Sequence, residues 1–158
     1  MGIINEELVL QAIELMRPTV SKIFKQTGTT WGPKWVVGYI NTPGLDTAIK
    51  FEFGRSPKKI WRKKWGNPSI FCKIAKKNRA VAEREQMATS LVAKLKPWVF
   101  KKEEFLYLGG SYSDEISCGV SGAKEQTDEA IGEILINIIK MLAFLETDSR
   151  IEKKQMEI

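Results

Sequence analysis

The sequence predicts an α+β sandwich with a largely antiparallel sheet flanked by helices. Helical and strand patterns follow one another in the order helix, two strands, helix, two strands, helix. The chain has 158 residues, 43% of them apolar and 28% charged, which suits one globular domain. We expect a single domain over residues 1–146 and a polar C-terminal tail over 147–158 that frays.

The first half of the chain contains an expected helix and an expected hairpin. Residues 5–26 begin with Asn5, a typical N-cap, and Pro18 is expected to kink this helix or to split it near Arg17. Residues 35–40 and 47–53 have strand patterns and are joined by a turn that contains proline and glycine.

The second half is expected to begin with the longest helix, over residues 67–97, which starts at an Asn-Pro pair. Residues 104–108 and 115–120 are predicted to pair as strands around a glycine- and serine-rich turn at 109–114. The segment between the two hairpin regions, 54–66, has no clear period and is predicted to be a long loop.

A last helix is expected over residues 125–146, with acidic residues in its first turn. Ile136, Ile139 and Ala143 widen its apolar face beyond what one sheet should cover. This width favours a subunit interface on the helix.

The net charge of +6 is concentrated in one segment of the chain. Residues 55–84 carry eleven basic side chains and one acidic side chain, and the remaining residues are net −4. A basic stripe on a mildly acidic protein suggests a local anionic partner.

The basic segment includes Trp61 and Arg62, in a run that mixes cations with flat aromatic rings. Such a mixture binds single-stranded nucleic acid, and it also suits a small anionic ring compound. Lys76 and Arg79 lie one helical turn apart and could share a phosphate or carboxylate.

Residue types that are missing or rare exclude several functions. The chain has no histidine, which removes the commonest metal ligand and the usual general base. Cys72 and Cys118 have no metal-ligand spacing, so we expect no metal site and no disulfide, and a reducing cytoplasm fits best. The N-terminus shows no secretory leader and no stretch has the length of a membrane span.

Two glycine-containing segments precede the last helix: Gly109-Gly110-Ser111-Tyr112 and Gly119-Val120-Ser121-Gly122-Ala123. Glycine permits tight turns and close backbone approach, and a turn before a helix can present amides to an anion. The alternative that these glycines only shape the chain stays open. Ser121 lacks the spacing and the histidine partner of a hydrolase nucleophile.

The second glycine-containing segment, followed by Asp128-Glu129 and an apolar helix, resembles the GlcG/HbpS-like family, a domain also found at the C-terminal end of PduO-type proteins. The resemblance covers most of residues 69–146. It implies a profilin-like sandwich of about five antiparallel strands that assembles into dimers or larger homo-oligomers, some members binding haem or cobalamin-related ligands. Without histidine, haem would need another ligand, for which the candidates are Tyr107, Tyr112, Met87 and Cys118.

The expected function is non-catalytic binding of a small anionic ligand, aromatic or tetrapyrrole-like, by a cytoplasmic homo-oligomer. The candidate ligand-binding residues come from the glycine segments and the basic stretch: Gly109, Gly110, Ser111, Tyr112, Gly119, Ser121, Gly122, Lys76, Arg79, Trp61 and Arg62. A nucleic-acid-binding module that uses residues 55–84 is the alternative. An enzyme that uses Lys76 with Glu83 or Asp128 is the least favoured interpretation.

Overall fold

Four antiparallel strands form one open sheet in the part of the chain that this computed structural model describes, residues 3–56, 67–102, 104 and 107–156. The sheet order is β2-β1-β4-β3, and the strands are β1 (Trp35–Asn41), β2 (Ile49–Gly54), β3 (Gly110–Ser113) and β4 (Ile116–Ser121). The helices are α1 (Glu6–Phe24), α3 (Pro68–Glu85), α4 (Thr89–Leu95), the short 3-10 helix η1 (Pro97–Val99) and α5 (Glu125–Met156). The predicted α+β class with an antiparallel sheet is confirmed.

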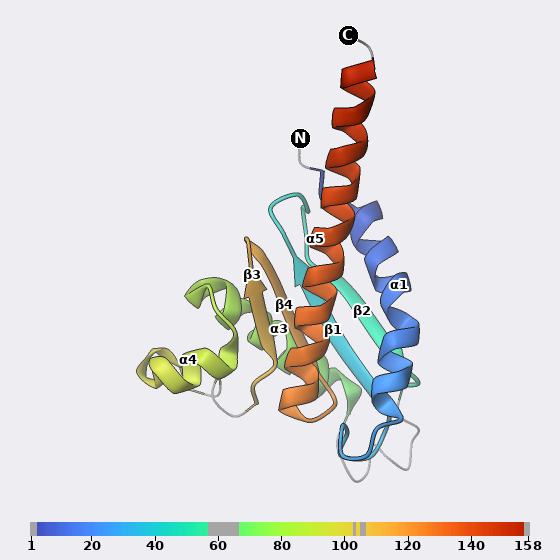
Figure 1. Cartoon of the computed structure of the whole chain (residues 1–158). Coiled ribbons are helices and arrows are strands. Elements are labelled where there is room, and N and C mark those ends of the chain that lie inside the picture. The colour runs from blue at the N-terminus through green and yellow to red at the C-terminus, as the bar shows by residue number, and fades with distance from the viewer. Residues whose placement is uncertain (1–2, 57–66, 103, 105–106, 157–158) are drawn as a thin grey trace.

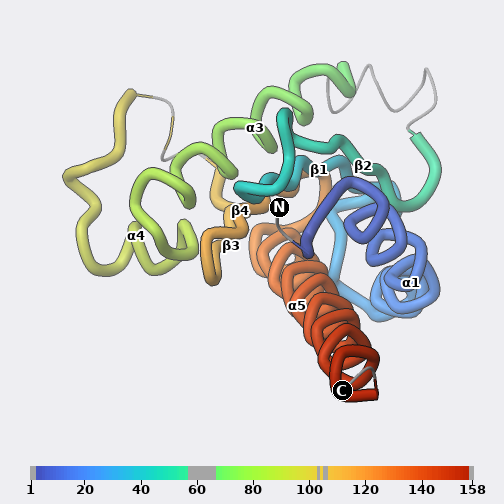
Figure 2. Tube along the Cα trace, turned by 90° about the horizontal axis from the view of Figure 1, so that it is seen from above, coloured from blue at the N-terminus to red at the C-terminus, as the bar shows by residue number. Residues whose placement is uncertain are grey.

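Helices cover both faces of the sheet. α3 packs on one face, while α1 and α5 lie side by side on the other (Figures 1 and 2). Side chains of β4 alternate between these layers, so Gly119 lies against α3 and Cys118 lies near Gly132 of α5. Because both faces are covered, every residue of β4 is buried.

The main apolar core lies between the sheet and the α1–α5 pair. Ile136 and Ile139, which were expected at a subunit interface, belong to this core, with 2% and 0% of their surface exposed. That expectation is wrong because α1 packs along α5 and covers the added width, a contact that a single helix pattern does not reveal. The homo-oligomer itself stays a prediction.

The N-terminal helix is one continuous element. Asn5 caps it as expected, since its side-chain oxygen accepts a hydrogen bond from the Leu8 amide at 2.9 Å. Pro18 lies inside α1, so the expected split near Arg17 is wrong. Pro18 and Glu14 are both on the exposed side of the helix, where water can replace the backbone hydrogen bond that proline cannot donate.

The expected long helix over 67–97 is two helices. α3 ends at Glu85, the following Gln86 has the left-handed backbone conformation with φ 54°, and α4 begins at Thr89. The break places Thr89 where its hydroxyl accepts hydrogen bonds from the amides of Gly109 and Gly110, at 3.0 and 2.9 Å. A left-handed residue that is not glycine leaves little trace in a sequence, so the break was missed.

The second hairpin is shifted from its predicted position. β3 occupies residues 110–113, which were expected to form the turn, and the turn is Asp114-Glu115, both with positive φ. Of the expected strand over 104–108, residues 105 and 106 lie outside the described residues, and the others are turn or loop.

The last helix is longer than expected. α5 continues to Met156, so the expected end near residue 146 is wrong. Its C-terminal part extends beyond the sheet (Figure 1). No helix in the described ranges has the length and apolar character needed to cross a membrane.

Candidate ligand-binding site

The predicted glycine segments form a packing surface for α3. A Cβ atom on Gly119 would overlap the Ala75 carbonyl oxygen and the Arg79 amide, and one on Gly110 would overlap the Asn78 carbonyl. Both glycines are buried, and the space in front of them is filled by the backbone of α3. Both glycines therefore allow α3 to approach the sheet closely.

Polar groups of the same segments are used inside the protein. The amides of Gly109 and Gly110 donate to the Thr89 hydroxyl rather than facing a free cavity. The Ser111 hydroxyl donates to the Glu129 carbonyl at 3.0 Å. Ser121 is 6% exposed. Gly122 has φ +127° and lies against the Trp35 backbone, so it shapes the junction between β4 and α5.

The predicted basic residues on α3 are separated in their contacts. The Arg79 guanidinium donates to the Glu83 carboxylate at 2.7 Å and to the Ser117 hydroxyl at 3.0 Å. The Lys76 ammonium lies 5.2 Å from the centroid of the Tyr39 ring. Arg79 is thus paired with Glu83 while Lys76 contacts an aromatic ring, and a joint anion site on these two cations stays a prediction. The Glu83 carboxylate pairs with Arg79 and not with Lys76, the pairing that an acid–base reaction would need.

Tyr112 lines a pocket that none of the predicted glycines lines. This pocket of about 290 Å³ is also lined by Glu83 and Glu115, whose negative charges disfavour an anionic ligand. Trp61 and Arg62 lie outside the described residues.

The haem ligand candidates include one side chain that is closed to any ligand. Cys118 has 0% of its surface exposed, and burial raises the pKa of its thiol far above the usual value. A side chain with no exposed surface leaves no access for haem iron to its sulfur, so Cys118 does not fit the role of a haem ligand. Within the described ranges, no three Cys, Asp or Glu side chains cluster closely enough to hold a metal ion.

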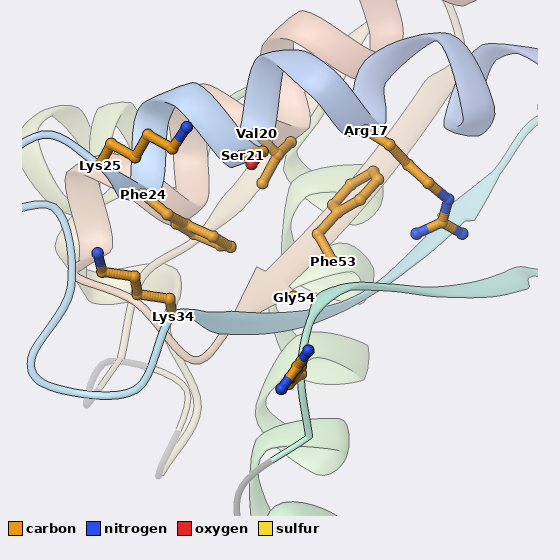
Figure 3. A pocket seen from close by; sticks show the side chains of 9 residues that line it. Arg17, Val20, Ser21, Phe24, Lys25, Lys34, Phe53 and Gly54 are labelled. Carbon is orange, nitrogen blue, oxygen red and sulfur yellow. The ribbon is translucent and has the colours of Figure 1, made fainter.

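A basic pocket of about 460 Å³ lies between α1 and the edge strand β2. Among the described residues, four cations and no acid line it, around an apolar floor formed by Val20, Phe24 and Phe53. Figure 3 shows Lys25 and Lys34 at one end, Arg17 at the other, and the two phenylalanine rings between them. The full lining is Arg17, Val20, Ser21, Phe24, Lys25, Lys34, Phe53, Gly54 and Arg55.

Local sequence explains how the basic pocket is built. Arg17, Ser21 and Lys25 follow one another at four-residue spacing, which aligns them along one side of α1. On the sheet side, Gly54 has φ +83°, and a Cβ atom there would overlap the Lys34 carbonyl. Glycine at this position therefore lets the end of β2 approach Lys34 and places Arg55 beside it.

The four cations differ in their electrostatic surroundings. Arg17 donates to the Glu14 carboxylate and to the Glu52 carbonyl, both at 2.9 Å, and its guanidinium carbon lies 5.5 Å from the Phe53 ring centroid. Lys25, Lys34 and Arg55 form no ion pair within the residues that the structure describes. Three cations that line one pocket and have no ion pair within the described residues favour an anion in that pocket.

Sequence reasoning missed the basic pocket, although a signal was present. The spacing of Arg17, Ser21 and Lys25 indicates a polar stripe, and Lys34 and Arg55 flank the predicted first hairpin. Placing the stripe beside the hairpin required knowledge that α1 packs next to β2.

Comparison with known proteins adds no evidence on the site, because no family model, curated protein or solved structure matches the chain. The resemblance to the GlcG/HbpS-like family therefore stays a prediction.

Asp128 is a buried acid at the start of α5. It is 4% exposed, and its Oδ1 accepts a hydrogen bond from the Ala123 amide at 3.0 Å. Burial raises the pKa of Asp128 well above the usual value, the Ala123 hydrogen bond opposes this rise, and the Glu125 charge adds to it. Folded Asp128 thus keeps its proton at pH values where the unfolded chain has lost it.

Replacing Asp128 with asparagine is expected to flatten the pH dependence of stability. Because the folded pKa is raised, the contribution of Asp128 to stability falls as pH rises above about 4, the pKa of an unfolded aspartate. Asparagine keeps an oxygen for the Ala123 amide and has no proton to lose, so Asp128→Asn should be at least as stable as wild type at pH 7. Urea unfolding between pH 4 and 8 measures this.

The exposed Asp148 of α5 provides the control, since Asp148→Asn should leave the pH profile unchanged. A loss of more than about 1 kcal/mol at pH 7 in Asp128→Asn would show instead that a carboxylate stabilises the start of the helix.

Proposed function

We propose that this protein is a non-catalytic binding domain that holds a small anionic ligand in the basic pocket between α1 and β2. The observation that carries the proposal is the presence of three cations, Lys25, Lys34 and Arg55, beside an apolar floor, none of which has an ion pair among the described residues. A volume of about 460 Å³ falls in the range of small-molecule sites.

The proposal includes membership of the GlcG/HbpS-like family, a profilin-like sandwich and self-association in the cytoplasm. The order β3, β4, α5, with Gly119 to Ala123 at the junction of strand and helix, supports the family. Cys72 and Cys118 are free thiols, which supports a reducing compartment.

Reversing two charges of the basic pocket is expected to weaken ligand binding. We expect the double variant Lys25→Glu, Lys34→Glu to bind 2-naphthoate, a flat aromatic acid, at least about tenfold more weakly than wild type. Both lysines are exposed, so the variant should fold. Isothermal titration calorimetry at 50 mM and 300 mM salt measures the change.

The matched control is Lys73→Glu, Lys77→Glu, with the same change in charge on exposed residues of α3, across the sheet from the basic pocket. Equal losses in both variants would indicate general electrostatic attraction and contradict the proposal. Wild-type protein that does not bind 2-naphthoate would also contradict it.

Nucleic acid is the second candidate, favoured by the exposed Lys73, Lys76 and Lys77 along α3. It predicts that a single-stranded oligonucleotide binds at 50 mM salt, that binding falls steeply with salt, and that Lys73→Glu, Lys77→Glu abolishes it. Unchanged oligonucleotide mobility at 50 mM salt would remove this candidate.

A further inference from the structure

The two ends of the basic pocket are chemically different. At one end, Lys25 and Lys34 approach from α1 and from the start of β1, and Figure 3 shows Phe24 between them. Arg55 directly follows Gly54, whose Cα lies beside the Lys34 carbonyl. We call this end, where Lys25 and Lys34 form no ion pair within the described residues, the lysine end.

At the other end, Arg17 is already neutralised and fixed. Glu14 holds its Nε, the Glu52 carbonyl accepts from its Nη1, and the guanidinium lies over the Phe53 ring. An anion that bound Arg17 would have to compete with the carboxylate of Glu14, so this end attracts negative charge less than the lysine end does.

Between the two ends the pocket is apolar. Val20, Phe24 and Phe53 are 1%, 5% and 2% exposed, so they are anchored in the core and can move little. The small surface they present to the pocket suits the face of a flat apolar group. An inorganic anion would leave this floor uncovered.

We infer that the ligand is an amphiphilic acid with one anionic head group, bound with its carboxylate, phosphate or sulfonate at the lysine end and a flat apolar body across Phe24 and Phe53 towards Arg17. This inference rests on the proposed function and adds the class and direction of the ligand. Glu14 acts as a specificity-determining residue, because its pairing with Arg17 disfavours a second acidic group on the ligand.

A series of matched naphthalenes tests the ligand class by calorimetry on the full chain. 2-Naphthoate should bind at least about tenfold more tightly than neutral 2-naphthol and than inorganic phosphate. 2,6-Naphthalenedicarboxylate, which carries an acid at both ends, should bind no more tightly than 2-naphthoate.

Removing the charge of Glu14 takes away the ion pair of Arg17 and should favour the dicarboxylate relative to 2-naphthoate. In Glu14→Gln, the affinity for the dicarboxylate should rise about threefold relative to that for 2-naphthoate. Glu14 is exposed, so the variant should fold, and Glu7→Gln removes an equal charge from the same helix as the control.

The outcomes separate the inference from the proposed function. Tighter binding of the dicarboxylate by wild type, or no change in preference in Glu14→Gln, would overturn the polarised pocket while the proposed site stands. If no naphthalene acid binds, or if Lys25→Glu, Lys34→Glu binds 2-naphthoate as wild type does, the proposed function itself fails.

Discussion

Replacing Gly119 with alanine should lower the free energy of unfolding by about 3 kcal/mol, near the upper end of the usual cost of overpacking. The added Cβ would overlap the Ala75 carbonyl and the Arg79 amide, which belong to the backbone of α3 and cannot rotate away. The whole helix would have to shift from the sheet. Urea unfolding followed by far-UV circular dichroism measures the loss.

Gly28→Ala is the matched control for Gly119→Ala. A Cβ atom on Gly28 would meet only the flexible Lys124 ammonium, at 4.0 Å, but φ is +83°. Its expected cost is about 1 kcal/mol from backbone strain alone. If Gly119→Ala lowers the free energy of unfolding no more than Gly28→Ala does, α3 does not pack tightly against Gly119.

The same variant separates a packing glycine from a ligand-contacting one. Gly119 faces α3, across the sheet from the basic pocket, so folded Gly119→Ala protein should bind 2-naphthoate as wild type does. A folded variant that has lost binding would instead support the glycine segments as the site, as the sequence predicted.

The parts of the fold that depend on neighbours in the sequence were predictable. Asn5 and Asn67 cap α1 and α3, accepting hydrogen bonds from the amides of Leu8 and Ser69. These contacts span two or three residues, so the residue type and the following pattern are enough to predict them.

The second hairpin could not be predicted from its own residues. β3 is the short run Gly-Ser-Tyr-Ser, whose glycine and serines have low strand propensity. Its turn, Asp114-Glu115, has positive φ at both residues without the glycine that normally marks such a turn. Pairing with β4 therefore decides the structure of a segment whose own residues indicate a loop.

The basic pocket could not be predicted from the sequence for a related reason. Gly119 and Arg79 are conspicuous along the chain, yet the fold uses both to join α3 to the sheet. Lys25, Lys34 and Arg55 are inconspicuous, since each sits in a different element or loop. Only the packing of α1 beside β2 brings them together, and that packing is set by apolar contacts distant in sequence.

Replacing Ile139 with alanine should produce a comparable or larger loss of stability, about 2–5 kcal/mol. Ile139 is 0% exposed in the core between α5, α1 and the sheet. Removing its branched chain gives up burial and leaves a cavity, because close-packed neighbours relax only in part. Urea unfolding of Ile139→Ala against wild type measures the effect.

Leu145, six residues later on the same helix, is the control. It is 58% exposed, so Leu145→Ala should change stability by no more than about 0.5 kcal/mol in the monomer. Equal losses in the two variants would contradict this division of α5 into a core half and an exposed half. If the loss in Leu145→Ala grows with protein concentration, Leu145 is buried between copies of the chain, because only an associated state couples stability to concentration.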